Sequence, residues 1–301
     1  MTATTPWDLP TVDATWCAGR VDEVATIGYR EDEPITPASV MKVQVAIAAA
    51  SAMHDGRIDG PAPLLLDPAS RTPGPVGMSL LHDPVTTTPR DLLPPMLTLS
   101  DNAATDALLS LLGVEAVNAA TAAWGMPGTW LSEDLAMLDG LAREIGFARY
   151  AELAAHDHTL QGPRGAENIR HAIARSAALD PARGSRTTPA DMVRLLRLIW
   201  TDAAGPAPAC ALIRELMSQQ LTQHRIASGA ARGWSVAAKS GGLFGIVRNE
   251  VGVVIDETGT AYVIAVFTRQ SVDDDTDPRD IDAAIGRLAR RLVDRLRDRG
   301  S

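Results

Sequence analysis

Ser39 and Lys42 lie three residues apart near the start of an apolar run, ITPASVMKVQVAIAAA, which covers residues 35–50. On a helix this spacing places both side chains on one face. A serine hydroxyl needs a base to become a good nucleophile, and a partly desolvated lysine can take its proton, whereas an arginine cannot. The pair therefore predicts a nucleophile and its base. A lysine whose stem covers apolar surface while its ammonium reaches water fits the same spacing.

Two further motifs favour the chemical interpretation. Ser100, Asp101 and Asn102 supply a hydroxyl that can relay protons and an amide that can hold a substrate carbonyl, although the same residues are typical of turns and helix caps. Lys239, Ser240 and Gly241 end a strand-like run, where glycine lets a substrate approach the backbone closely, or simply marks the end of a strand. Lys42 and Lys239 are the two lysines among 28 basic residues, and both fall in these motifs.

Composition limits the possible partners. The net charge is −9, which argues against nucleic acid or an anionic membrane surface, and no apolar run is long enough to span a bilayer. Two cysteines define no disulfide framework. The densest histidine group, His156-Asp157-His158, lies in a polar region without a nearby cysteine, so we expect a solvated loop and no metal. The sequence carries no signature for a cofactor.

The amino terminus, MTATTPWDLPTVDATW, has neither a basic region nor an apolar core of the kind found in secretory signals. We therefore expect a cytoplasmic protein, or a secreted one if a leader has been removed. A monomer is the default expectation.

Strand-like runs occur at both ends of the chain and helical patterns in the middle. The runs TWCAGRV and VATIGYR come first, and SVAAKSG, NEVGVVID and AYVIAVFTR follow Trp234, the last two joined by a predicted hairpin turn at residues 256–259. Thr88-Pro89 and Thr188-Pro189 have the cap-and-proline pattern of helix starts. An apolar stripe at the carboxyl end predicts a helix that packs on the sheet; its members are Ile281, Ile285, Leu288, Leu292 and Leu296.

These patterns predict an α+β fold, an α/β sandwich in which the two chain ends form one antiparallel sheet of five-stranded type flanked by helices. Residues 1–38 and 235–301 would make this α/β subdomain, and residues 39–234 a mostly helical subdomain. A site would then fall in the cleft between them.

The three motifs, in this order, resemble the signature of the penicillin-recognising serine enzymes, and the chain is similar to their class A β-lactamase branch from about residue 16 to its carboxyl-terminal helix. The resemblance implies a β-lactamase or transpeptidase-like fold and a small-molecule substrate that bears a carboxylate.

Carried over by position, the resemblance implies Ser39 as the acylated nucleophile, Lys42 as its base partner and Ser100 as the proton relay. Asn102 would bind the substrate amide, and Lys239 with Ser240 would hold the substrate carboxylate. The backbone N–H groups of Ser39 and Gly242 would form the oxyanion hole. Arg248 occupies the place of a carboxylate-binding arginine, or is a plain surface position on a strand.

The chain departs from the class A pattern in the omega loop. There the family carries a glutamate, followed by a leucine and an asparagine, that activates water for deacylation, whereas this chain reads TWLSEDLAMLDG. Glu133 is the nearest candidate; Asp134, Glu144 and Glu167 do not fit the pattern either. The region is also enlarged, over residues 133–180.

Without that glutamate we expect acylation at Ser39 but not fast hydrolysis of a penicilloyl-type ester. The leading hypothesis is a serine hydrolase of the class A β-lactamase fold that acts through an acyl-enzyme on an amide, ester or β-lactam. The alternatives are a covalent β-lactam binder or sensor without turnover, an intracellular biosynthetic esterase, amidase or transacylase, and a D-Ala-D-Ala peptidase.

Overall fold

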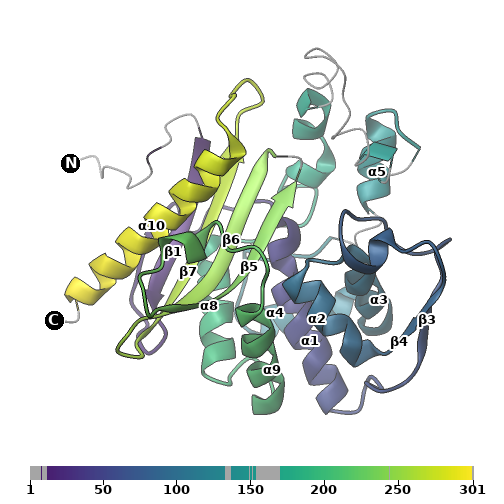
Figure 1. The fold of residues 1–301 in the computed structure, drawn as a ribbon, viewed down its shortest axis with the longest axis horizontal. Helices are drawn as coiled ribbons and strands as arrows, with labels where there is room; N and C mark the ends of the chain where they lie inside the picture. Colours follow the sequence, from purple (N-terminus) through teal and green to yellow (C-terminus); the bar gives the residue numbers. More distant parts are fainter. Residues whose placement is uncertain are drawn as a thin grey trace.

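A five-stranded antiparallel sheet forms the centre of the molecule, with its strands in the spatial order β2-β1-β7-β6-β5. The computed structural model describes residue 8 and residues 12–132, 137–148, 150, 152–153, 170–243 and 245–299. The strands are β1 (Val12–Arg20), β2 (Thr26–Tyr29), β5 (Ser235–Leu243), β6 (Val247–Ile255) and β7 (Ala261–Gln270). The two ends of the chain thus share one sheet, as the sequence predicts, and β5 lies at its edge (Figure 1).

The described helices flank this sheet or lie beside it. The α-helices are α1 (Lys42–His54), α2 (Pro89–Thr98), α3 (Asn102–Leu112), α4 (Val114–Ala123), α5 (Met137–Glu144), α8 (Pro189–Trp200), α9 (Ala207–Ser218) and α10 (Pro278–Arg299). Short 3-10 helices are η1 (Ala38–Met41), η2 (Gly77–Leu80), η3 (Ala177–Leu179) and η4 (Ile226–Gly229). Figure 1 shows α10 along one face of the sheet and the helices α1 to α4 gathered beyond the β5 edge.

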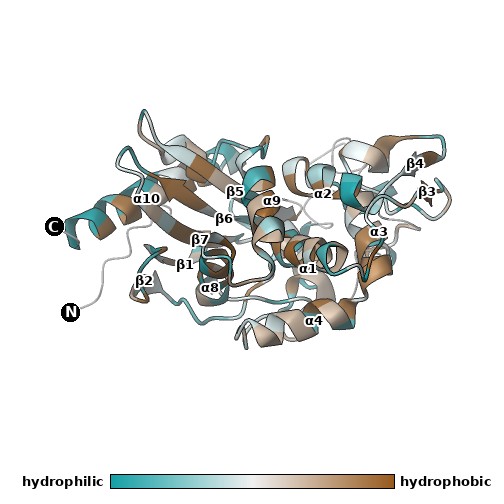
Figure 2. Ribbon diagram, turned by 90° about the horizontal axis from the view of Figure 1, so that it is seen from below, coloured by the Kyte–Doolittle hydropathy of each residue, from teal (hydrophilic) through white to brown (hydrophobic). Residues whose placement is uncertain are grey.

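Helix α10 covers one face of the sheet because its apolar residues follow a single stripe. All five predicted members of the stripe are buried, and they share a core with inward-facing residues of β1 and β7 such as Trp16 and Ile264. The opposite side of the helix is hydrophilic (Figure 2). The prediction of a carboxyl-terminal helix packed on the sheet is confirmed.

Helix α8 packs against the other face of the sheet, and α9 and α1 continue this layer past the β5 edge. One continuous core joins β6 and β7 to these helices, which explains why the strand AYVIAVFTR is apolar at nearly every position. The layers match the predicted α+β class. The division into subdomains at residues 38/39 and 234/235 stays a prediction, with the enlarged loop region only partly described.

Helices α2 and α8 each begin with a threonine cap followed by a proline, as the sequence predicts. The Thr88 hydroxyl accepts a hydrogen bond from the Asp91 N–H, and Thr188 accepts one from the Asp191 N–H, with a proline at the first helical position of each helix. Helix α2 runs through Pro94 and Pro95 and ends only after Thr98.

The hairpin between β6 and β7 is confirmed at residues 256–259. The Asp256 carboxylate accepts from the N–H groups of Thr258 and Thr260, and Gly259 has a φ of +86°. A second sheet was not predicted: β3 (Leu64–Leu66) pairs with β4 (Val85–Thr87), and strands of three residues are too short to show a period.

Within the described part of the chain, no single helix combines the length and hydropathy needed to span a membrane, and α3 with α4 does so only as a pair bent by 82°.

The turn that carries Ser39 packs closely against β5, the edge strand of the sheet. Ser39 lies in η1, which runs directly into α1 at Lys42, so the predicted helix begins as a 3-10 turn. This turn packs on β5 and β6. A Cβ atom at Gly241 of β5 would lie 2.8 Å from the Pro37 carbonyl oxygen and 3.1 Å from the Val40 nitrogen. Only glycine therefore lets the strand and the turn approach this closely.

We expect Gly241→Ala to lower the free energy of unfolding by about 1–3 kcal/mol, because the added methyl group must push backbone atoms apart. Gly140→Ala is the matched control: its Cβ would meet nothing within 4 Å in helix α5, so no loss is expected. Urea denaturation of both variants measures the difference. Equal stabilities would show that the strand and the turn are not in close contact.

Candidate active site

The structure brings the three predicted motifs together around Ser39. Ser39 is half-buried and opens into a small cavity of about 70 Å³, lined also by Asn102, Tyr150 and Gly242. Ala38, which precedes it, has a φ of +49°, a left-handed conformation that is uncommon for alanine. Residues held in such conformations cluster at functional sites, where the surrounding packing fixes them.

Lys42 is fully buried and directed at the second motif. Its Nζ atom donates to the Ser100 carbonyl oxygen at 2.6 Å and to the Asn102 Oδ1 atom at 2.8 Å, and lies 3.3 Å from the Ser100 Oγ atom. Burial lowers the pKa of Lys42 to about 7, while the negative charges of Asp101 and Asp106 act in the opposite direction. The amine is thus half neutral near pH 7 and can act as a base.

Asp101 holds the second motif in place. Its buried carboxylate accepts from the Ala104 N–H at the start of α3, from the Met78 N–H at 2.6 Å and from the Ser79 hydroxyl. Ser100, just before it, has a φ of +70°. Sequence reasoning assigned Asp101 no role of its own, although aspartate is a favoured helix cap. In the structure it fixes the backbone that presents Ser100 to Lys42.

The Asn102 side chain contacts Lys42 and also a backbone carbonyl group. Its Oδ1 atom accepts from Lys42, and its Nδ2 atom donates to the Pro73 carbonyl oxygen at 3.2 Å. The side chain also lines the cavity at Ser39. A role in binding a substrate amide stays a prediction, since both polar atoms of the side chain already have partners.

Lys239 lies on β5, almost completely buried, with its Nζ atom donating to the Ser240 carbonyl oxygen at 2.8 Å. Burial and the nearby charge of Lys42 lower the pKa of Lys239 well below the ordinary lysine value, and the charge of Glu250 opposes this shift. The two lysines of the chain therefore lie close enough to interact. An anion bound beside them would favour their charged forms.

The edge of β5 presents backbone groups toward the cavity. The Ser240 N–H donates to the Gln220 side-chain carbonyl, so it points away from β6. Backbone groups two residues apart on a strand point in the same direction, so the N–H of Gly242 also points outward, beside Ser39. This arrangement fits the predicted oxyanion hole of two N–H donors.

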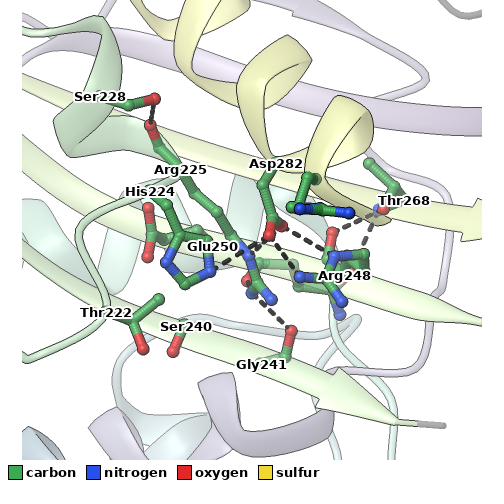
Figure 3. A network of polar contacts seen from close by, with 12 residues as sticks. Thr222, His224, Arg225, Ser228, Ser240, Gly241, Arg248, Glu250, Thr268 and Asp282 are labelled. Atoms are coloured by element: carbon green, nitrogen blue, oxygen red, sulfur yellow. Dashed lines mark hydrogen bonds and ion pairs between the residues drawn. The ribbon is translucent and has the colours of Figure 1, made fainter. Parts of the chain in front are cut away.

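Arg248 is engaged by an acidic partner that the sequence did not indicate. Its Nε atom donates to the Asp282 Oδ1 atom at 2.8 Å, and a second bond joins the same two side chains. Arg225 donates to the same carboxylate at 2.7 Å, and His224 lies 3.1 Å from it. Figure 3 shows Arg225 and Arg248 converging on Asp282, beside the strand that carries Ser240 and Gly241. The predicted role of Arg248 in binding a substrate carboxylate stays a prediction.

Asp282 comes from α10 and holds this arginine pair against β5 and β6. Although its burial acts to raise the pKa, hydrogen bonds and charge from Arg248 and Arg225 lower the pKa of the Asp282 carboxyl. Arg225 also donates to the Gly241 and Asn249 carbonyl oxygens, at 2.9 Å and 2.6 Å. The ion pairs thus support the strand end that forms one wall of the site.

Glu250 is a second buried carboxyl group that sequence reasoning missed. It accepts from the Gln220 side-chain amide at 3.0 Å and from the Ile226 N–H at 2.6 Å, and it pairs across the sheet with Ser240. Burial raises the pKa of Glu250 to about 7, against the opposing charge of Arg225. A carboxylate inside the apolar strand NEVGVVID was the available signal.

The deacylating base remains unassigned. Glu133, Asp134 and Glu167 lie outside the described residues, and Glu144 is exposed on α5. Among the residues that the structure describes, no group of three or more His, Cys, Asp and Glu side chains is placed to hold a metal ion.

Comparison with known proteins identifies the family to which the chain is similar. Residues 11–296 match the model of the β-lactamase enzyme family. The chain is 31% identical to the β-lactamase regulatory protein BlaB of Streptomyces cacaoi, over 90% of this chain and 89% of that protein.

Solved structures share the fold at lower identity. A β-lactamase from Sphaerobacter thermophilus is 23% identical with a TM-score of 0.71, covering 92% of this chain and 90% of its own. The structure of PBP-A is 18% identical with a TM-score of 0.73, covering 96% and 92%. An ancestral class A β-lactamase is 21% identical with a TM-score of 0.72, covering 95% of both chains.

We expect Asp282→Ala to lower the free energy of unfolding by about 3 kcal/mol, because it leaves two largely buried guanidinium groups without their carboxylate. Asp294→Ala removes the partner of Arg290 in an exposed pair on the same helix, and its cost should stay below about 1 kcal/mol. Denaturant titration measures both. A similar small loss in the two variants would contradict a supporting role for Asp282.

Proposed function

Because the chain belongs to the β-lactamase enzyme family, we propose that Ser39 forms a covalent acyl-enzyme with an amide, ester or β-lactam substrate that carries a carboxylate. The observation that supports this most strongly is the environment of Lys42. A buried amine with a pKa of about 7, in contact with Ser100 and Asn102 and one helical turn from Ser39, is suited to taking a proton at neutral pH.

In the proposed acylation, the Ser39 oxygen attacks the substrate carbonyl while neutral Lys42 accepts the hydroxyl proton. The N–H groups of Ser39 and Gly242 stabilise the negative charge that develops on the carbonyl oxygen. The carbonyl bond to the leaving nitrogen or oxygen then breaks, and that atom receives a proton through the Ser100 hydroxyl, 3.3 Å from the Lys42 Nζ atom. Every proton donor and acceptor in these steps belongs to the chain or to the substrate.

The substrate carboxylate would bind beside Lys239 and Ser240, which precede the cavity-lining Gly242 on β5, with the arginine pair nearby. Lys239, Arg225 and Arg248 carry three positive charges when Lys239 is protonated, against the carboxylates of Asp282 and Glu250. A bound carboxylate would favour the protonated form of Lys239 by adding the missing negative charge. Small-molecule binding of this kind is compatible with a monomeric, cytoplasmic protein, both of which stay predictions.

A second candidate function is a sensor in which the acyl group stays on Ser39. Its support is that the relative at 31% identity is named a β-lactamase regulatory protein, and that no deacylating glutamate is assigned among the described residues. Turnover by hydrolysis, transfer of the acyl group, or peptidase activity all share the same first step. The fate of the acyl group is therefore what separates a hydrolase from a sensor.

Intact-protein mass spectrometry over time, after mixing with a penicillin and a chromogenic cephalosporin, tests the proposal. We expect a mass increase of one acyl group on the wild-type chain and on Ser70→Ala, an exposed serine that does not line the cavity at Ser39, and none on Ser39→Ala. A transient adduct with released product indicates a hydrolase, and a lasting adduct indicates a sensor. An adduct that persists in Ser39→Ala would contradict the assignment of the nucleophile.

The acylation rate should depend on pH through Lys42. Since only the neutral amine accepts the proton, the rate constant should rise about tenfold per pH unit below pH 7 and level off above it. Stopped-flow measurement of acylation at several pH values tests this. A rate constant that is flat between pH 5 and pH 8 would exclude Lys42 as the base with this pKa.

A further inference from the structure

A second cavity, of about 230 Å³, lies behind the turn that carries Ser39. Its floor is the end of the sheet, where Asp13 faces Arg269 and Thr15 faces Phe267 across β1 and β7. The segment of residues 33–36 forms one wall, and Pro181 closes another side. The volume lies below the roughly 300 Å³ at which pockets for drug-sized ligands begin, so a smaller molecule fits.

Two hydroxyl groups in this cavity lack partners. Thr15 is 3% exposed, and within the described chain neither its Oγ1 atom nor the Oγ1 atom of Thr36 has a hydrogen-bond partner. Buried polar atoms are normally satisfied, because leaving them unpaired is unfavourable. Both threonines line the cavity, next to the apolar side chains of Phe267 and Val247. A ligand with a small apolar body and a polar tip would satisfy both kinds of surface.

Charged side chains of both signs line the cavity. Asp13 and Glu33 share one cation, Arg30, so two carboxylates contact a single guanidinium there. Arg269, opposite Asp13 in the register of β1 and β7, donates to the carbonyl oxygens of Leu179 and Ala174. Carboxylates and a guanidinium at the same cavity suit a ligand that carries charges of both signs.

We propose that this cavity binds a small zwitterion of amino-acid size. Its ammonium group faces Asp13 and Glu33, its carboxylate faces Arg269, and its polar tip reaches the hydroxyls of Thr15 and Thr36. This site is separate from the one at Ser39, and its occupancy does not depend on acylation.

The zwitterion site adjoins the active site through Thr36, which lines both cavities. Asn249, at the back of the zwitterion site, donates to the carbonyl oxygens of Thr36 at 2.9 Å and Pro37 at 3.2 Å. Ala38, with its left-handed backbone, follows at once. A ligand in this cavity therefore contacts the segment that positions Ser39.

Saturation-transfer NMR with free L-serine, L-glutamine and L-valine at millimolar concentration tests the proposal on the full chain. We expect transfer from the protein to at least one of these amino acids. Its methyl ester and its N-acetyl derivative, each lacking one charge, should bind at least about tenfold more weakly. Binding should be unchanged in Ser39→Ala, which keeps this result independent of the acyl-enzyme proposal.

Variants locate the binding site. Thr15→Val removes an unpaired hydroxyl at nearly constant volume, so the thermal midpoint should stay the same or rise while amino-acid binding weakens about tenfold. Arg269→Gln should weaken the amino acid and leave its methyl ester unaffected. Thr98→Val and Arg295→Gln, outside the cavity, are the matched controls. Absence of binding to all three amino acids, or equal binding by Thr15→Val, Arg269→Gln and the wild-type chain, would overturn the proposal.

Discussion

The burial of the Lys42 ammonium is the constraint on which the rest of the site depends. Its three polar contacts, to Ser100 and Asn102, are the groups that a charged amine needs in an interior, yet burial still lowers its pKa to about 7. An arginine there would stay charged at any accessible pH. Asp101, buried at the start of α3, moderates the shift and fixes the Ser100 turn, so one carboxylate serves both electrostatics and geometry.

The position of Lys42 in turn depends on a close contact between η1 and β5. Gly241 allows the strand to touch the Ser39 turn, and the ion pairs of Arg225 and Arg248 with Asp282 support the strand from behind. The carboxyl-terminal helix is thus linked to the catalytic strand by charge as well as by its apolar stripe. Glu250 and Gln220 add a second support, because Gln220 also accepts from the Ser240 N–H.

Local sequence patterns predicted much of this fold, because strands, turns and helix caps depend mainly on residues that are close in the sequence. Period and turn chemistry identified the five strands of the main sheet, the Thr88 and Thr188 caps and the apolar stripe of α10. The residue types of Ser39, Lys42, Ser100 and Lys239 predicted a common site, and the structure brings Lys42 to Ser100 and near Lys239.

Contacts between segments distant in the sequence could not be predicted from local patterns. The ion pairs of Asp282 with Arg225 and Arg248 join three parts of the chain, and no sequence pattern indicates them. The helix through Pro94-Pro95 likewise reflects tertiary packing of Leu92 and Leu93 rather than local propensity.

The most direct test of the account is the pKa of Lys42 itself. The chain contains only two lysines, so selective ¹³C labelling of the lysine Cε atoms yields two NMR signals, and Lys42→Met identifies which one belongs to Lys42. Titration of the Lys42 signal should give a midpoint near pH 7, because burial disfavours the charged form. A midpoint near the ordinary value of 10.5 would show that Lys42 is charged at neutral pH and cannot be the base that activates Ser39.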